Sequence, residues 1–308
     1  MDNRPTPAPA PWISPAEAAE ALRTGTGRGV RIAVLDSGID WRHYWLRRLK
    51  RAGDVVVRQE EGRLMGAPGK GEDVFGHGTA VAWIIHSLAP EAEIISIRVL
   101  DEGNHARSEI ICEGAEQALD HGAHILNCSF GARLRQQVLM FKNWTDRAYL
   151  EQRHVVAACN NDDFRRPEWP GDFTSVITVN MVADVPPDAL VANQPGALVE
   201  FAALGVGLRV PWLDGRWAIR TGSSFAAPRV TALLARLLSV FPGLSPWEAK
   251  SLLLRVARPA GDFTAAGPAS VPEPELVPYP GMGFPAPGPA MPAFGAVSPN
   301  TGAGPRIS

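Results

Sequence analysis

The sequence has few cysteines, no uninterrupted apolar run of membrane-spanning length and almost no excess of charge, and each shortage excludes a class of protein. Three cysteines among 308 residues are too few and too scattered for a disulfide framework. A formal net charge of −2 gives no electrostatic reason to expect a nucleic acid or an anionic membrane as partner. The longest apolar region, residues 225–241, contains Arg229 and Arg236, which favours a helix of a soluble domain over a membrane span.

The scarcity of cysteine also bears on the compartment. We expect Cys112, Cys128 and Cys159 to be buried thiols of a reducing environment. No apolar stretch follows Met1 that could form the core of a signal peptide. We therefore expect a cytoplasmic protein.

Apolar and helical segments alternate along the chain. With 45% hydrophobic residues the sequence can bury one large core. Strands are predicted at 30–35, 94–99, 124–128, 155–158 and 176–179, with shorter ones at 199–201, 208–210 and 217–220, and helices at 79–88, 108–121 and 137–152. This order predicts an α/β fold, a three-layer α/β/α domain with a mainly parallel sheet.

Composition and capping signals set the domain boundaries. Residues 1–12 are rich in proline and expected to be flexible. Capping boxes at Ser14 and Ser245 open the first and last helices, so that one folded domain should cover residues 13–258. Residues 259–308 hold about twelve of the 28 prolines, with much Gly and Ala, and are expected to be a disordered tail that could recruit a protein partner.

Three short segments carry residues with catalytic chemistry. Asp36 ends an apolar strand, His77 lies between two glycines at the start of an apolar helix, and Ser224 lies among small residues at the start of another. A serine needs a base to take its proton, and the base needs an acid to fix its tautomer. Each segment alone has a plainer interpretation: a turn, an incidental histidine, a helix N-cap. Their combination, in the order Asp, His, Ser, favours a serine hydrolase.

A fourth candidate is Asn160, after the strand at 155–158. A side-chain amide at this position could donate to a developing oxyanion, although an Asn pair after a strand is otherwise an ordinary turn.

Together these segments resemble the subtilisin-type serine proteases of the subtilase superfamily, over about residues 29–257. The resemblance implies a subtilisin-like peptidase domain in which Asp36 supports His77, the general base, and Ser224 is the nucleophile. Asn160 would complete the oxyanion hole with the Ser224 backbone N–H. It also implies that Ser129, Phe130 and Gly131 pair with an extended substrate on one side and that Gly103 and Asn104 form the opposite rail. Endopeptidase action on extended or unfolded segments follows.

The sequence departs from the family pattern in a few places. Ser223 stands where threonine is usual, and Cys159 stands where a glycine usually precedes the oxyanion donor. The helix after His77 continues without the metal-binding loop of calcium-dependent relatives, so that calcium site is predicted absent. No cofactor and no metal are expected.

The resemblance places the pocket for the residue before the cleaved bond near residues 161–163 and 168–169. Glu168 or Asp163 at its floor would favour Arg or Lys by direct charge pairing, while Arg165 and Arg166 could neutralise them.

We thus predict an intracellular serine endopeptidase that acts in protein degradation or peptide maturation. Two alternatives remain. One is a catalytically weak pseudoprotease that binds peptides without cleaving them. The other is a peptide ligase or macrocyclase that passes the same acyl-enzyme to an amine.

Overall fold

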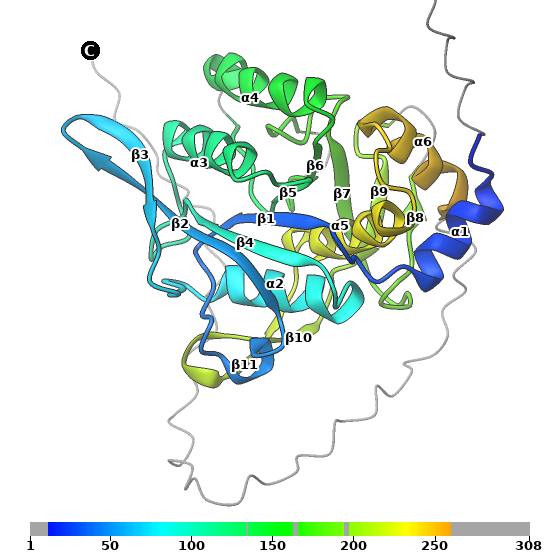
Figure 1. Cartoon of the computed structure of the whole chain (residues 1–308), viewed down its shortest axis with the longest axis horizontal. Coiled ribbons are helices and arrows are strands. Elements are labelled where there is room, and N and C mark those ends of the chain that lie inside the picture. The colour runs from blue at the N-terminus through cyan, green and yellow to red at the C-terminus, as the bar shows by residue number, and fades with distance from the viewer. Residues whose placement is uncertain (1–11, 134, 163–165, 194–196, 260–308) are drawn as a thin grey trace, which may run out of the picture. The chain divides into compact units, whose positions relative to one another are not determined.

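A computed structural model describes residues 12–133, 135–162, 166–193 and 197–259 (Figure 1). These residues belong to one compact unit, Met1–Gly267. The predictions for residues 1–11 and for the tail at 260–308 lie outside the described residues. Among the described residues, no helix is both long and apolar enough to cross a membrane.

A ten-stranded sheet forms the centre of the unit, in the order β12-β8-β9-β7-β6-β5-β1-β4-β2-β3. From β9 to β2 all neighbouring strands are parallel, and only β3 against β2 and β8 against β9 are antiparallel. The bounds are β1 (Arg31–Asp36), β2 (Lys50–Glu60), β3 (Arg63–Pro68), β4 (Glu93–Arg98), β5 (Ile125–Cys128), β6 (His154–Ala158), β7 (Ile177–Val182), β8 (Val191–Ala192), β9 (Phe201–Leu204) and β12 (Arg258–Pro259).

Helices cover both faces of this sheet, so the predicted α/β/α layering is confirmed (Figure 1). On one face lie α3 (Ser108–Asp120) and α4 (Val138–Leu150), and on the other α2 (His77–Leu88) and α5 (Ser223–Val240). Each face has its own apolar core because the strands are buried on both sides. Burial of each Val, Leu or Ile there contributes roughly 1.5–3 kcal/mol.

The two capping boxes form as predicted. The Ser14 hydroxyl accepts the backbone N–H of Glu17 at the start of α1 (Pro15–Thr24), and Ser245 accepts that of Glu248 at the start of α6 (Pro246–Val256). In both, the N-cap backbone N–H donates to the side-chain carboxylate of the N3 glutamate, so two otherwise unpaired donors are satisfied.

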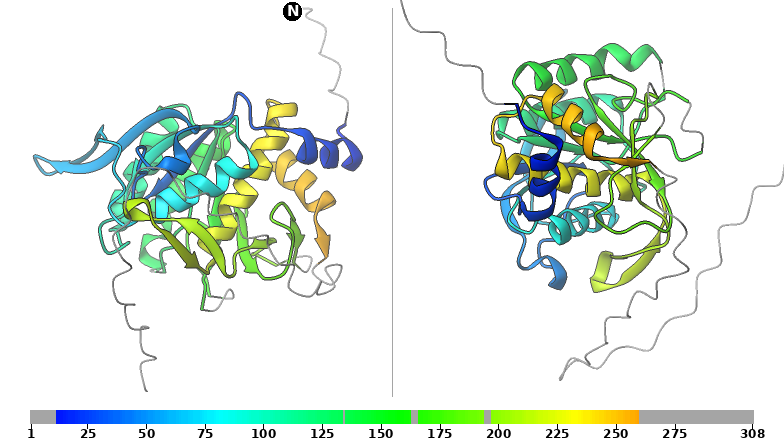
Figure 2. Two further views of the ribbon diagram at one scale, coloured as in Figure 1. Left: turned by 90° about the horizontal axis from the view of Figure 1, so that it is seen from below. Right: turned by 90° about the vertical axis from the view of Figure 1, so that its right-hand side faces the viewer.

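A small antiparallel hairpin, β10 (Leu208–Pro211) with β11 (Trp217–Arg220), leads into α5. In the left view of Figure 2 it lies beside α2, and the two elements are in contact. The hairpin therefore delivers the chain to the N-terminus of α5, where Ser224 lies.

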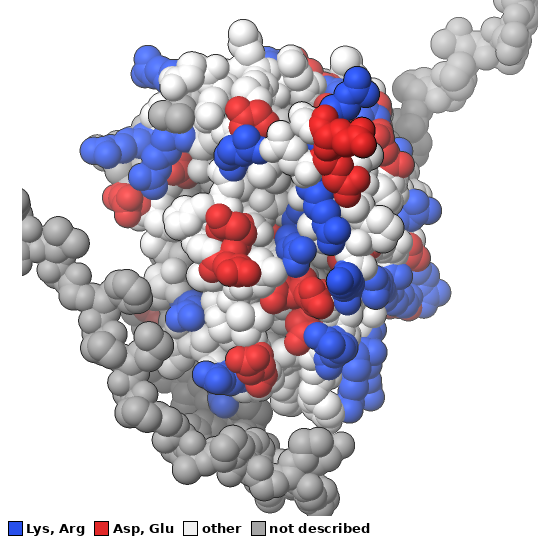
Figure 3. All heavy atoms as spheres, turned by 90° about the vertical axis from the view of Figure 1, so that its left-hand side faces the viewer, with Lys and Arg blue, Asp and Glu red and all other residues white. Residues whose placement is uncertain are grey.

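The long hairpin of β2 and β3 was not predicted from the sequence. Its residues are largely exposed and charged, and only Val55, Val56 and Val57 form a buried run. The face of the molecule drawn in Figure 3 carries basic and acidic side chains interspersed, with no large area of one sign. The strands β2 and β3 lack the continuous apolar pattern from which the central strands were predicted.

Candidate active site

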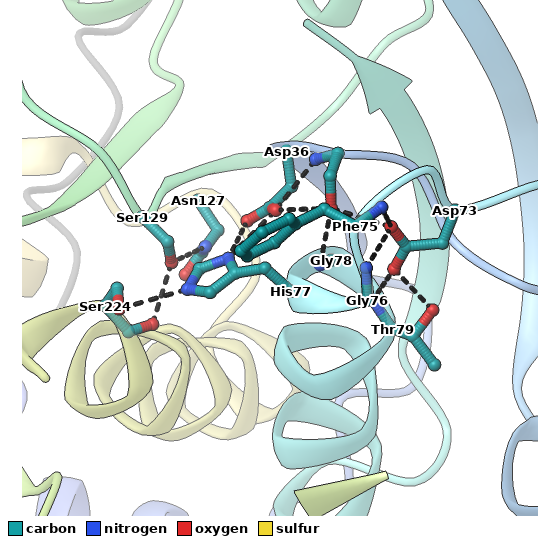
Figure 4. A network of polar contacts seen from close by, with 11 residues as sticks. Asp36, Asp73, Phe75, Gly76, His77, Gly78, Thr79, Asn127, Ser129 and Ser224 are labelled. Carbon is teal, nitrogen blue, oxygen red and sulfur yellow. Dashed lines mark hydrogen bonds and ion pairs between the residues drawn. The ribbon is translucent and has the colours of Figure 1, made fainter. Parts of the chain in front are cut away.

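The three predicted catalytic side chains meet at the carboxyl ends of the central strands. Asp36 is the last residue of β1, His77 the first of α2 and Ser224 the second of α5. His77 Nδ1 lies 2.9 Å from both carboxylate oxygens of Asp36, and its Nε2 lies 3.0 Å from Ser224 Oγ (Figure 4). Contact with the Asp36 carboxylate places the proton on Nδ1, which leaves Nε2 free to accept from the serine hydroxyl.

The environment of His77 holds its imidazole tightly. His77 is 4% exposed, and its ring packs against Phe225 and, in an edge-to-face arrangement, against Trp212. Burial by itself lowers the pKa of His77, but the charge of Asp36, its hydrogen bond and the charge of Asp73 outweigh this, so that the pKa is raised. The site thus stabilises the imidazolium that forms when His77 accepts a proton.

A second carboxylate, Asp73, organises the turn before His77. It accepts hydrogen bonds from the Gly76 and Thr79 backbone N–H groups and from the hydroxyls of Thr79 and Ser37, at 2.6–2.8 Å (Figure 4). Ser37 in turn accepts the N–H of Gly78. Because these donors surround the start of α2, Asp73 fixes the backbone that carries His77. Sequence reasoning missed Asp73, although it lies four residues before His77.

Two glycines, Gly76 and Gly78, allow the start of α2 to lie close to the end of β1. Gly76 has φ 104°, in the left-handed region that favours glycine. A Cβ on Gly78 would overlap the carbonyl oxygen of Gly38, so only glycine lets α2 start against the end of β1.

The turn before Ser224 is tied to the loop after β6. Ser223 Oγ donates to the Cys159 carbonyl oxygen over 2.6 Å, and the Ser223 backbone N–H donates to Asn161 Oδ1 over 2.7 Å. Serine at position 223 therefore keeps the contact with the Cys159 carbonyl that the hydroxyl of a threonine could make, since the hydroxyl alone forms this hydrogen bond. The Cys159 Sγ lies 3.4 Å from Asn180 Oδ1.

A buried polar chain supports Ser224 from the side of β5. Thr231 donates to Asn127, whose amide donates to Ser129 Oγ, and this hydroxyl donates to the Ser224 carbonyl oxygen over 3.0 Å. Ser129 was predicted as a substrate-binding residue. In the structure its side chain faces the nucleophile turn.

The two asparagines after β6 face different partners. Asn160 is 2% exposed, and its amide nitrogen donates to Glu168 Oε1 over 3.0 Å. Asn161 is exposed and reaches the Ser223 N–H, directly before the nucleophile. The role predicted for Asn160 in the oxyanion hole stays a prediction, and Asn161, which sequence reasoning did not weigh as a donor, is the nearer to Ser223.

Glu168, predicted to bind substrate, is 8% exposed and forms an ion pair with Arg133 over 2.6 Å. Asp163 and Arg165, weighed with it in the sequence, lie outside the described residues. Arg166 is exposed. The cation seen to pair with Glu168 in the described part of the chain, Arg133, belongs to a different loop, which proximity in sequence could not indicate.

The predicted substrate rails follow the two strands that flank β1. Ser129, Phe130 and Gly131 continue from β5, and Gly103 and Asn104 lie in the loop after β4. Asp101 Oδ1 accepts the Gly103 and His105 N–H groups, which makes that loop compact. Because β4 and β5 lie on either side of β1, the rails lie on either side of Asp36.

Within the described ranges, no group of three His, Cys, Asp or Glu side chains is placed to hold a metal ion. The helix α2 runs without interruption from His77 to Leu88.

Comparison with known proteins places this chain in one family. The model of the subtilase family matches residues 27–273. The chain is 29% identical over 273 residues to M-protease of Shouchella clausii, covering 83% of this chain and 67% of that protein. It is equally similar to Subtilisin BL of Lederbergia lenta, covering 94% of that protein.

The fold has a solved counterpart as well. The crystal structure of a cold adapted subtilisin-like serine proteinase superposes with a TM-score of 0.61 at 22% identity, covering 74% of this chain and 82% of that one. The match of the family model over most of the chain, with this fold, shows that the protein belongs to the subtilase family of subtilisin-like serine proteases.

Proposed function

We propose that this protein is a serine endopeptidase that cleaves extended peptide segments through an acyl-enzyme on Ser224. The observation that carries the proposal is the continuous set of contacts from Asp36 through His77 to Ser224, at 2.9 and 3.0 Å. These distances suit proton transfer without rearrangement.

The first chemical step follows from these contacts. Ser224 Oγ attacks the peptide carbonyl carbon while His77 Nε2 takes its proton, and Asp36 stabilises the resulting imidazolium. His77 then gives this proton to the leaving amine, and the acyl group stays on Ser224. A water molecule, deprotonated by His77 in the same way, releases the acyl group and restores the serine.

The carbonyl oxygen becomes negatively charged in each attack, and hydrogen-bond donors are needed to stabilise it. The first N–H groups of α5 have no partner within the helix, which makes the Ser224 N–H one suitable donor. We propose Asn161 as the second, because its Oδ1 is held by the Ser223 N–H and its amide is thereby fixed beside the nucleophile turn. Asn160, the candidate chosen from sequence, has its amide directed to Glu168.

Labelling with a fluorophosphonate tests the nucleophile. The wild type should label covalently, Ser224→Ala should not, and Ser87→Ala, a change at an exposed serine of α2, should label as the wild type does. Folded wild type that fails to label would favour the alternative of a peptide-binding pseudoprotease.

Product masses test the reaction. Incubation with an unfolded protein should give fragments whose summed mass exceeds that of the substrate by one water for each cleavage. Products joined to an added amine in place of water would indicate a ligase or macrocyclase.

We also propose an intracellular setting, which the three unpaired cysteines support. A relative named minor extracellular protease Epr of Bacillus subtilis makes this worth a direct test. Fractionation of the producing cells should place the protein with the soluble intracellular fraction, and recovery from the medium would refute the proposal.

A further inference from the structure

The buried carboxylate of Glu168 connects the ends of two neighbouring strands. Asn160, just after β6, donates to its Oε1 over 3.0 Å. Gly131, just after β5, approaches so closely that a Cβ there would overlap the Glu168 carboxylate. Since β5 and β6 are adjacent parallel strands, the carboxylate lies between their carboxyl ends, where ligands bind in open α/β sheets.

The backbone of Glu168 is fixed in this place. Trp169 and Ala132 exchange two backbone hydrogen bonds of 2.9 Å, so the segment that carries Glu168 pairs with the predicted substrate rail. The Glu168 carbonyl oxygen also accepts the N–H of Asp172. The carboxylate is thus set beside the rail by main-chain contacts on both sides of it.

Arg133, the cation that pairs with Glu168, is held much less firmly than the carboxylate itself. Arg133 Nε lies 2.6 Å from Glu168 Oε1, but the Arg133 side chain is 58% exposed and that of Glu168 only 9%. Its other contact, with Asp162 at 3.5 Å, involves two exposed side chains. The pKa of Arg133 is raised, mainly by its hydrogen bond to Glu168.

The difference in burial between Arg133 and Glu168 determines which of the two partners can be replaced. A guanidinium that is already half in water can leave at small cost, because water replaces its lost contacts. A buried carboxylate left without a cation is unfavourable, because its charge is then unpaired. Glu168 can therefore exchange Arg133 for another cation at small cost, and it binds a new cation more readily when Arg133 is absent.

We propose that Glu168 determines substrate specificity and that Arg133 occupies it until an arginine or lysine of the substrate takes its place. The inference rests on the proposed peptidase function. It takes the residue concerned to be the one before the cleaved bond, which is the position that the sequence resemblance implies for this pocket. Asn160 keeps hold of Oε1 during the exchange. A neutral substrate residue leaves Arg133 where it is and gains nothing from the carboxylate.

The test uses peptides that differ only at this position, with Arg, Lys, Leu or Glu. The wild type should cleave the Arg and Lys peptides with a kcat/KM about tenfold above that of the Leu peptide. Arg133→Met removes the competing cation but keeps the length of the stem. It should lower KM for the Arg peptide several-fold and leave the Leu peptide unchanged.

Glu168→Gln keeps the shape of the side chain but removes its charge, and it should abolish the preference for the Arg peptide. In a protein that already carries Glu168→Gln, adding Arg133→Met should change no KM. Arg135→Met, an exposed arginine of the same segment, should behave as the wild type for every peptide. If Glu168→Gln folds poorly, the inference is tested by Arg133→Met alone, through the change in KM for the Arg peptide compared with the Leu peptide.

Three results would overturn the inference: preference of the wild type for Leu, persistence of the Arg preference in Glu168→Gln, or an equal effect of Arg133→Met on both peptides. In each case fluorophosphonate labelling of Ser224 would persist, so the peptidase function would stand. Loss of labelling in the wild type would instead remove the proposed function itself.

Discussion

Asn161 Oδ1 accepts the backbone N–H of Ser223 over 2.7 Å, one residue before the proposed nucleophile. This bond orients the Asn161 amide, because an oxygen committed to Ser223 leaves the nitrogen as the group that can face a reacting carbonyl. The amide nitrogen of the neighbouring Asn160 donates instead to Glu168 Oε1.

The two asparagines should therefore differ when replaced. Asn161→Ala is expected to lower kcat about 10²- to 10³-fold with little change in KM, the size typical of losing one oxyanion donor. Asn160→Ala should act mainly on KM, because it releases Glu168. Steady-state kinetics on one peptide measure both, and a larger loss of kcat in Asn160→Ala would restore the prediction made from sequence.

The pH dependence of kcat/KM should report the titration of His77. Only the neutral imidazole can accept the serine proton, so activity should increase with pH as His77 loses its proton. The raised pKa places the midpoint above the usual value near 6.5. A profile that is flat through neutral pH would contradict the role of His77 as base.

Asp73 should tune this midpoint. Its charge favours the imidazolium, so Asp73→Asn should move the midpoint of the kcat/KM profile to lower pH. It should also lower the free energy of unfolding, by roughly 1.5–3 kcal/mol, since charge-assisted hydrogen bonds at the start of α2 are weakened.

Glu72→Gln is the matched control for Asp73→Asn, because Glu72 is adjacent, exposed and of the same charge. Chemical denaturation and the pH profile together separate the two effects of Asp73. Equal shifts in both variants would mean that Asp73 acts only through the net charge of the surface.

Cys159 should be chemically silent despite its place beside the site. Burial raises its pKa to about 12, so almost no thiolate exists near neutral pH. Iodoacetamide at pH 7.5 should leave the activity of the folded protein intact, and Cys159→Ala should remain active. Inactivation by iodoacetamide that is absent in Cys159→Ala would show that the thiol takes part.

The parts of the fold that could be predicted from sequence are those with strong local signals. The apolar runs ending at Asp36 and Cys128 mark strands buried on both faces, and the capping boxes at Ser14 and Ser245 mark the start of two helices. The hairpin of β2 and β3 carries no such signal, because its residues are exposed and are held by pairing with β4 at one edge of the sheet.

The sequence by itself determined the central parallel strands, the two capped helix starts at Ser14 and Ser245 and the order Asp36, His77, Ser224, since each depends on residues close together in the chain. Only the tertiary structure decided which side chains meet. The ion pair of Arg133 with Glu168 and the different partners of Asn160 and Asn161 arise where separate loops converge at the ends of β5 and β6. The physical reason is that the direction of a side chain and the identity of its partner depend on the packing of segments distant in sequence, which local pattern does not encode.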